Sequence, residues 1–192
     1  MKSLSTWLRM LPLLLLTIAL LPAMAGARGL KDYQHIVWTQ QHGLPSDLMD
    51  LAQTTDGWLW IGSGDGLFRF DGVSAERYLP AAHPGFAHQR VIELLAADNG
   101  DLYISYFPGG VAILRRDGSF TPLPELANSR RTPPLAMAVD RDGSLWTIGH
   151  GIRRFANGRW TTIDSEAPWI DDAPYSLLLD QDGRLWASGP GG

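Results

Sequence analysis

The sequence contains no cysteine, so no disulfide framework contributes to its stability. It also has little charge of either sign. The formal net charge is −4, and it becomes −6 once Lys2 and Arg9 are removed with the N-terminal segment described below. A nucleic-acid surface needs clustered lysine and arginine, so nucleic acid is excluded as a partner. After residue 25 there is no apolar run of the length that crosses a bilayer. The fold must therefore be stabilised by burial of apolar surface alone.

The one long apolar run lies at the N-terminus and has the pattern of a secretory signal peptide. Lys2 and Arg9 precede the apolar stretch Leu11–Leu21, and Ala23-Met24-Ala25 follows as a small-x-small cleavage site. An uncleaved membrane anchor is the alternative, but the run is shorter than the roughly 20 residues that span a bilayer. We predict that residues 1–25 are a signal peptide, cleaved after Ala25, and that the mature chain is exported.

Glycine (21 residues) and tryptophan (8 residues) are abundant, and they mark an internal repeat. The unit is a turn, a short apolar strand, a glycine-rich corner and a second strand, and it is clearest at Asp56–Gly72. The repeated turn glycines are spaced by 43, 43 and 40 residues, and an aromatic residue follows three places later in each unit. These positions are Gly57, Gly100, Gly143, Gly183 and Trp60, Tyr103, Trp146, Trp186. A period near 40 residues built from short strands is typical of a β-propeller blade.

The sequence therefore predicts an all-β fold of propeller blades, each with four antiparallel strands. A lead-in strand and turn are expected at 26–47, and a partial propeller at 48–192, with repeats near 48–80, 91–124, 134–163 and 175–192. The Asp-Gly pairs are expected to form two-residue hairpin turns. About three and a half blades are present, so the ring is incomplete and leaves open sheet edges. We interpret the chain as the N-terminal piece of a longer protein. Ring completion by oligomerisation is the alternative, and a homodimer is left open.

Blade one resembles a known repeat family. His42-Gly43-Leu44-Pro45-Ser46, followed by the Asp56–Gly72 unit, is similar at nearly every position to the two-component regulator propeller repeat, with Ser63 in place of threonine. Blades three and four match in part. Blade two departs most, because Tyr103 replaces the tryptophan and Tyr106–Gly110 replaces the small-residue corner.

This resemblance implies a function. It implies a periplasmic sensor region ahead of a β-sandwich, a membrane span and a cytoplasmic histidine kinase or diguanylate cyclase, all beyond residue 192. The chain would then lie on the periplasmic face of the inner membrane and bind an unidentified small molecule or glycan. Its other partner would be the remainder of the receptor chain. No enzymatic activity is expected within this segment.

Candidate sites in the sequence are few. The aspartate-rich turns, such as Asp140–Gly143, lack the later ligands of a calcium loop and are explained by turn chemistry. No two histidines have the spacing of a helical zinc site, and neither Ser63 nor Ser105 lies in a nucleophile elbow. No catalytic residue, metal site or cofactor is therefore predicted. Most of the repeat tryptophans are expected to pack in the core.

If a ligand binds, propeller geometry suggests the position. When the first strand of each repeat lies innermost, the corners between the second and third strands share one face with the connectors between blades. Concave places with a few convergent polar groups favour ligands. The predicted ligand-binding residues on that face are Ser63, Asp65, Tyr106, Phe107 and His150.

Two other functions compete with the sensor interpretation. An exported propeller enzyme of lyase or glycosidase type would need an acid/base pair or a metal cluster on this same face, around the central channel. The acids of this sequence are instead expected in turns. A protein–protein interaction scaffold would need no small ligand. Fold alone does not choose among the three, and the family resemblance favours the sensor.

The size and location of the native product test the receptor interpretation. An epitope tag placed near Asn128, followed by fractionation of cells and immunoblotting, is expected to give a membrane-bound band far above 21.1 kDa. A soluble periplasmic band of about that mass would instead leave a self-assembling binding module.

Overall fold

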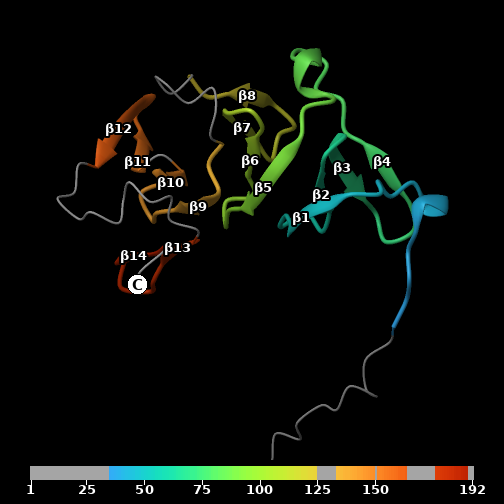
Figure 1. Cartoon of the computed structure of the whole chain (residues 1–192), viewed down its shortest axis with the longest axis horizontal. Helices are drawn as coiled ribbons and strands as arrows, with labels where there is room; N and C mark the ends of the chain where they lie inside the picture. Colours follow the sequence, from blue (N-terminus) through green and yellow to red (C-terminus); the bar gives the residue numbers. More distant parts are fainter. Residues whose placement is uncertain (1–34, 125–132, 150, 164–175, 190–192) are drawn as a thin grey trace, which may run out of the picture. The chain divides into compact units, whose positions relative to one another are not determined.

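A computed structural model of the chain describes residues 35–124, 133–149, 151–163 and 176–189 (Figure 1). The predicted signal peptide and His150 lie outside the described residues. The chain divides into two units, 1–37 and 38–192, and every described strand belongs to the second. Among the described residues, no helix is both long enough and apolar enough to cross a membrane.

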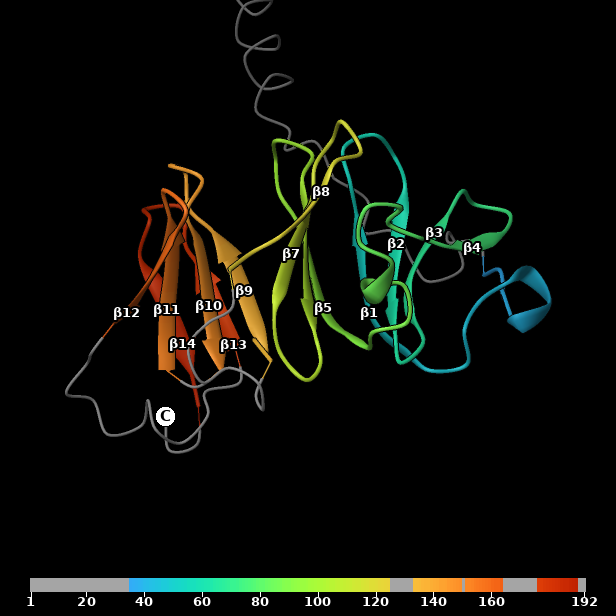
Figure 2. The ribbon, with the colours of Figure 1, turned by 90° about the horizontal axis from the view of Figure 1, so that it is seen from above.

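The described strands form four separate antiparallel sheets, which we call blades one to four (Figures 1 and 2). In each blade the strands pair in the order in which they follow along the chain. Blade one consists of β1 (Leu48–Gln53), β2 (Leu59–Ser63), β3 (Gly66–Phe70) and β4 (Ala75–Arg77). Blade two consists of β5 (Val91–Ala96), β6 (Leu102–Tyr106), β7 (Val111–Leu114) and β8 (Phe120–Pro122). Blade three consists of β9 (Ala136–Val139), β10 (Leu145–Gly149), β11 (Gly151–Ala156) and β12 (Arg159–Ile163), and blade four of β13 (Ser176–Leu179) and β14 (Leu185–Ser188). The prediction of an all-β fold with propeller-type blades is confirmed.

The hairpin between the first and second strands differs from the predicted two-residue turn. In blade one the Gly57 amide donates to the Thr54 carbonyl (2.9 Å) and the Thr54 amide donates to the Trp58 carbonyl (3.1 Å), which closes a three-residue loop. Gly57 is left-handed (φ 94°), whereas Asp56 is not. The Asp56 carboxylate accepts the Thr54 hydroxyl (2.6 Å) and the Trp58 amide (3.3 Å), contacts that suit a type I turn followed by a left-handed glycine.

A true two-residue turn occurs at Asn157-Gly158, where both residues have positive φ (51° and 76°). Asparagine tolerates the left-handed region better than most residues, so the tight turn forms here. The hydrogen bond donated by the Gly57 amide recurs in blades two, three and four, at Gly100, Gly143 and Gly183. The repeat at the sequence level is therefore a repeat of this three-residue loop.

The predicted lead-in strand is absent from its described part. Residues 35–39 form no strand, and the chain continues into η2 (Gln40–His42), a 3₁₀ turn. The Thr39 hydroxyl accepts the Gln41 amide (3.3 Å), and Gly43 ends the turn in the left-handed conformation (φ 83°). Trp38 instead packs its ring edge-on against Phe70, at 5.3 Å between ring centroids.

The hydrophobic core lies between neighbouring blades, because one face of each sheet packs against the next sheet. Trp60 and Leu67 of blade one pack with Val91, Leu94 and Leu102 of blade two. Blade two packs in the same way against blade three through Tyr103, Val111, Ile113, Met137 and Leu145, and blade three against blade four through Ala136, Ile148, Ile152, Leu177 and Leu185. The expectation that the repeat tryptophans are core residues is correct for Trp60 but wrong for Trp186, which is 57% exposed because no described strand covers its face of blade four.

One contact in the first of these cores requires glycine for space alone. A Cβ placed on Gly62 would lie 2.6 Å from Cγ1 of Val91, which is fully buried. Real Cβ atoms do not approach so closely, so β2 and β5 can meet only because position 62 has no side chain.

We expect Gly62→Ala to lower the free energy of unfolding by about 1–3 kcal/mol through overpacking. The double variant with Val91→Ala should lose less than the sum of the two single variants, because the valine methyl is the group that clashes. Urea unfolding measures both. Gly85→Ala is the matched control, since a Cβ at position 85 would have nothing within 4 Å, and its effect should stay within about 0.5 kcal/mol. Strict additivity at 62 and 91 would refute the proposed contact.

Candidate functional site

The corner between β2 and β3 of blade one is held by its own hydrogen bonds. The buried Ser63 hydroxyl donates to the Gly66 carbonyl (3.0 Å) and accepts the Asp65 amide (3.1 Å). Gly66 has φ 123°, a conformation that side-chain-bearing residues rarely adopt. The buried Ser63 hydroxyl therefore holds the corner in shape, whereas Asp65, two residues later, is exposed.

Asp65 is linked to the end of the same blade. Its carbonyl accepts a hydrogen bond from the guanidinium of Arg77, the last residue of β4. The Arg77 guanidinium also lies 3.3 Å from His88 Nδ1 and 4.8 Å from the centroid of the Phe68 ring. The Asp65 backbone, a guanidinium and an imidazole therefore meet at this corner.

The corner of blade two carries an exposed aromatic ring. Phe107 is 47% exposed, its amide donates to the Arg90 carbonyl (2.9 Å), and the Arg90 guanidinium lies 5.9 Å from the ring centroid. Tyr106 differs, because it is only 1% exposed and packs edge-on against Phe86 at 5.0 Å. Burial raises the pKa of the Tyr106 phenol well above its usual value, so the hydroxyl stays protonated.

The corners and the connectors between blades lie at the same end of the strands. A Cβ on Gly64 would collide with the Asp47 carboxylate, and the Ser105 hydroxyl donates to the Pro134 carbonyl (2.7 Å). In blade three, Gly149 approaches the Pro133 carbonyl. We call this surface the corner face. The sequence predicts that the corners and the connectors share one face, and the structure places them so. No contact among the described residues joins Asp65 to Phe107.

Three residues of the corner face were missed by the sequence interpretation: Arg77, His88 and Arg90. They lie at the end of β4 and in the connector to blade two, which contains η3 (Pro84–Phe86). Their contacts span 9 to 17 residues along the chain, and no local pattern marks them. The one feature of the sequence that could have indicated them is that an arginine lies at each end of the connector, Arg77 and Arg90.

Two carboxylates lie on the inner strands, although the acids were expected in turns. Asp50 of β1 accepts the Leu94 amide of β5 (2.7 Å), and Glu93 of β5 accepts the Met137 amide of β9 (3.0 Å). Each carboxylate thus binds an amide of the next blade's first strand, at an edge where no further strand pairs. The expectation that the acids lie in turns is therefore wrong for Asp50 and Glu93, which join neighbouring blades.

Glu93 is the titratable group most perturbed by this arrangement. Burial raises its pKa to about 7, the Met137 amide opposes the rise, and the nearby Asp50 charge adds to it. Glu93 Oε2 is buried and has no hydrogen-bond partner among the described residues. Ionisation of Glu93 lowers the stability of the folded protein, because it places a charge in a buried position where one carboxylate oxygen has no hydrogen-bond partner among the described residues.

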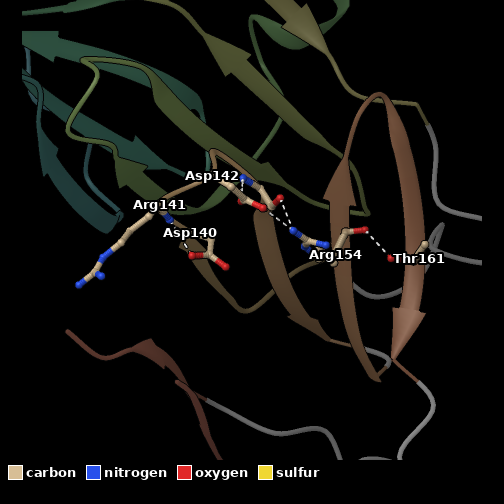
Figure 3. Close-up of polar contacts among 6 residues, drawn as sticks. Asp140, Arg141, Asp142, Arg154 and Thr161 are labelled. Atoms are coloured by element: carbon tan, nitrogen blue, oxygen red, sulfur yellow. Dashed lines mark hydrogen bonds and ion pairs between the residues drawn. The ribbon is translucent and has the colours of Figure 1, made fainter. Parts of the chain in front are cut away.

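At the opposite end of the strands, the aspartates serve their own turns. The Asp140 carboxylate accepts the Arg141 amide (2.7 Å), and the Asp142 carboxylate accepts the Ser144 amide (2.9 Å) and pairs with Arg154 (2.5 Å) (Figure 3). A hydrogen bond with the Ser144 side chain is the main cause that lowers the pKa of Asp142, and the Ser144 amide adds to it. These turns line a hollow of about 490 Å³ between blades two and three. Their oxygens are used locally, as turn chemistry predicts.

No protein-family model matches the chain, and no curated protein matches it. Solved structures are similar in fold. The extracellular domain of a hybrid two-component system from B. thetaiotaomicron aligns with a TM-score of 0.63 at 19% identity, over 78% of this chain and 21% of that one. A catalytically inactive virginiamycin B lyase from Staphylococcus aureus, solved with quinupristin, aligns with a TM-score of 0.63 at 14% identity, over 81% and 52%. A protein described as a gluconolactonase aligns with a TM-score of 0.53 at 19% identity, over 72% and 56%.

The chain thus spans about a fifth of the first of these proteins and about half of the other two. At these identities the similarity establishes the fold alone, and proteins described as a two-component system and as a lyase share it.

The raised pKa of Glu93 predicts a pH dependence of stability. Because the folded-state pKa of about 7 exceeds the ordinary value of 4.5, the unfolded chain releases this proton first as pH rises, and stability falls between about pH 4.5 and pH 7. The shift corresponds to a loss on the order of 3 kcal/mol. Glu93→Gln keeps an acceptor for the Met137 amide without the charge, so it should flatten this dependence and be more stable than the wild type at pH 8. Urea unfolding at pH 5 and pH 8 measures the difference.

Glu76→Gln is the control for that experiment. Glu76 pairs with Arg69 at an exposed position, and its loss should change stability by less than about 1 kcal/mol at either pH. The assignment fails if Glu93→Gln destabilises the protein equally at both pH values.

Proposed function

We propose that this chain belongs to the ligand-binding sensor region of an exported signalling receptor. The observation that carries the proposal is the His42–Gly72 sequence, which matches the two-component regulator propeller repeat almost throughout and folds here into blade one, with its turn glycine, corner and core tryptophan in place. The signal-peptide pattern at 1–25 supports export. The fold shared with the extracellular domain of a hybrid two-component system supports the same interpretation. The output domain, a histidine kinase or a diguanylate cyclase, lies beyond residue 192 in this proposal.

We place the ligand on the corner face between blades one and two. Phe107 supplies an exposed aromatic ring on which a planar or sugar ring stacks, and Arg90 lies beside it. Arg77 and His88 add hydrogen-bond donors next to Asp65. An aromatic platform with a few polar groups is suited to a small molecule or a glycan. Ser63 and Tyr106 contribute by holding the two corners in shape.

Enzymatic activity is the second candidate, and the carboxylates Asp50 and Glu93 are the observation that favours it. The pKa of Glu93, near 7, suits a general acid or base. However, Asp50 and Glu93 already accept backbone amides of the neighbouring blade, and the remaining oxygen of Glu93 is buried. A structural joint between blades accounts for both residues, so binding is the better-supported function. An interaction scaffold without a small ligand remains the third candidate.

The sensor proposal is tested in cells that carry the native gene. Deleting the gene should abolish the transcriptional response to one class of nutrient. Asp65→Asn combined with Phe107→Ala, in the full-length product, should reduce that response at least tenfold while the amount of protein is unchanged. Both side chains are exposed, whereas Tyr106 is avoided because its loss would disturb the core. RNA sequencing across nutrient conditions is the measurement.

Arg159→Gln, an exposed residue of β12, is the control and should respond like the wild type. An unaltered response after gene deletion would overturn the sensor function. A response lost on deletion but retained by the Asp65/Phe107 variant would leave the function standing and remove the corner face as its site.

A further inference from the structure

A small cavity lies between blades one and two, at the end of the strands opposite the corner face. Its volume is about 130 Å³, and it is lined by the turn residues Thr54 and Asp56 of blade one and by Gly100 and residues 115, 116 and 118 of blade two. We call it the turn-side cavity. For comparison, an engineered apolar cavity of about 150 Å³ takes up benzene. The turn-side cavity therefore has the size of a single six-membered ring.

The walls of the cavity are aromatic and aliphatic. Trp58, Trp60 and Tyr78 form one wall, and Leu102 and Leu114 form the other. Trp60 and Tyr78 contact edge-to-face at 5.4 Å, and the Trp60 indole is already satisfied by the Thr54 hydroxyl (3.0 Å). Leu102 is fully buried and Leu114 nearly so. Such walls favour an apolar ring over a heavily hydroxylated one.

Trp58 is an addition that the repeat does not require. By strand register, the residue in this place is Asp101 in blade two, Ser144 in blade three and Arg184 in blade four. Blade one alone, among the described blades, has an aromatic residue there. The Arg69 guanidinium stacks 4.8 Å from the Trp58 ring centroid and holds the ring in place while pairing with Glu76.

The rim of the cavity carries positive charge. Arg115 and Arg116 line it, and among the described residues neither forms an ion pair within 4 Å. Arg115 donates to the Thr121 hydroxyl (2.8 Å), which leaves its charge in place, although the exposed Asp117 lies near it. The one acid of the lining, Asp56, is engaged by the Thr54 hydroxyl and the Trp58 amide.

Close packing of the two blades positions Arg116. A Cβ on Gly100 would lie 2.8 Å from the Thr55 hydroxyl and 3.1 Å from Cδ of Arg116, whereas the corresponding Gly57, Gly143 and Gly183 have nothing within 4 Å. The Arg116 amide also donates to the Asp101 carboxylate (3.1 Å). The arginine stem thus lies over Gly100, at the junction of blades one and two.

We propose that the turn-side cavity is a binding site for a small aromatic monocarboxylate. The ring lies against Trp58, Trp60 and Tyr78, and the carboxylate pairs with Arg116 and Arg115 at the rim. The size of the cavity selects a single ring, and its apolar walls exclude sugars. The guanidinium groups of Arg115 and Arg116, which form no ion pair within 4 Å among the described residues, select the anion. The site is separate from the corner face, so either can fail without the other.

Benzoate is the probe, and the indole N–H signals of the tryptophans report its position. In a titration followed by two-dimensional ¹H–¹⁵N NMR at pH 7, benzoate should shift the Trp58 and Trp60 signals saturably and leave that of Trp186 in place. Benzamide, which has the ring without the charge, should bind at least about tenfold more weakly, as expected for a lost charge-assisted pair. Glucuronate, which has the charge on a hydroxylated ring, should bind no better than benzamide.

Variants test the two halves of the site. Arg116→Gln should weaken benzoate binding about three- to tenfold while binding of benzamide is unchanged. Arg159→Gln, which replaces an arginine of β12, should leave benzoate binding unaltered. Trp58→Leu should abolish binding. If Trp58→Leu does not fold, Arg116→Gln still tests the proposal, because Arg116 is exposed and its substitution should leave the fold intact. The proposal is overturned by the absence of saturable shifts, by equal binding of benzamide and benzoate, or by preference for glucuronate.

Discussion

The structure depends on close contact between the faces of neighbouring sheets. No disulfide is available, and each strand is only three to six residues long, so a single sheet cannot bury its own apolar face. Burial is achieved where Gly62 of β2 admits Val91 of β5, and apolar clusters also join blade two to blade three and blade three to blade four. Each blade is therefore stable only as a neighbour of another blade, which is the physical basis of repeat architectures. Leu51 and Leu178, on the first strands of blades one and four, stay more than half exposed because no described blade covers them.

The inner strands have a second requirement, which is polar. A first strand pairs with one neighbour only, and its other edge presents backbone amides to the next blade. Asp50 and Glu93 each bind one such amide, 44 residues further along the chain. In blade three the corresponding residue is Ala136, which has no side-chain acceptor to offer to blade four. Among the described residues, the joint between blades three and four combines apolar contacts with a hydrogen bond from the Arg141 guanidinium to the Gln181 carbonyl, whereas each of the first two joints also contains a carboxylate on its inner strand. The raised pKa of Glu93 makes the stability of the joint between blades two and three depend on pH.

Most of the fold could be predicted from the sequence, because the signals are local. The hairpins are marked in the sequence, since Asp-Gly and Asn-Gly pairs lie at the turns and the repeated aromatic residues lie on the second strands. The failures concern details that strand and turn signals do not specify, namely side-chain bonds within a loop and contacts between distant residues. The loop at Asp56 is three residues long because the carboxylate bonds within its own turn, and the described residues 35–39 form no strand. Of the predicted site, Asp65 and Phe107 are exposed, Ser63 and Tyr106 are buried, and His150 lies outside the described residues. Burial of a corner residue depends on the neighbouring blade, which no single repeat reveals.

Function in such a chain is best sought where one repeat departs from the others. Positions that are shared by all blades, such as the turn glycines, are explained by the turn and carry no information about a ligand. Phe107 stands in a corner that blade one builds from small residues, and Trp58 stands where the other blades have aspartate, serine and arginine. Neither aromatic ring is required by the sheet that bears it, and each has an arginine beside its face. Trp58 is only partly buried and Phe107 is 47% exposed, so each ring contributes less to folding than a core ring does. The presence of two such rings beside cations is more simply explained by recognition than by stability.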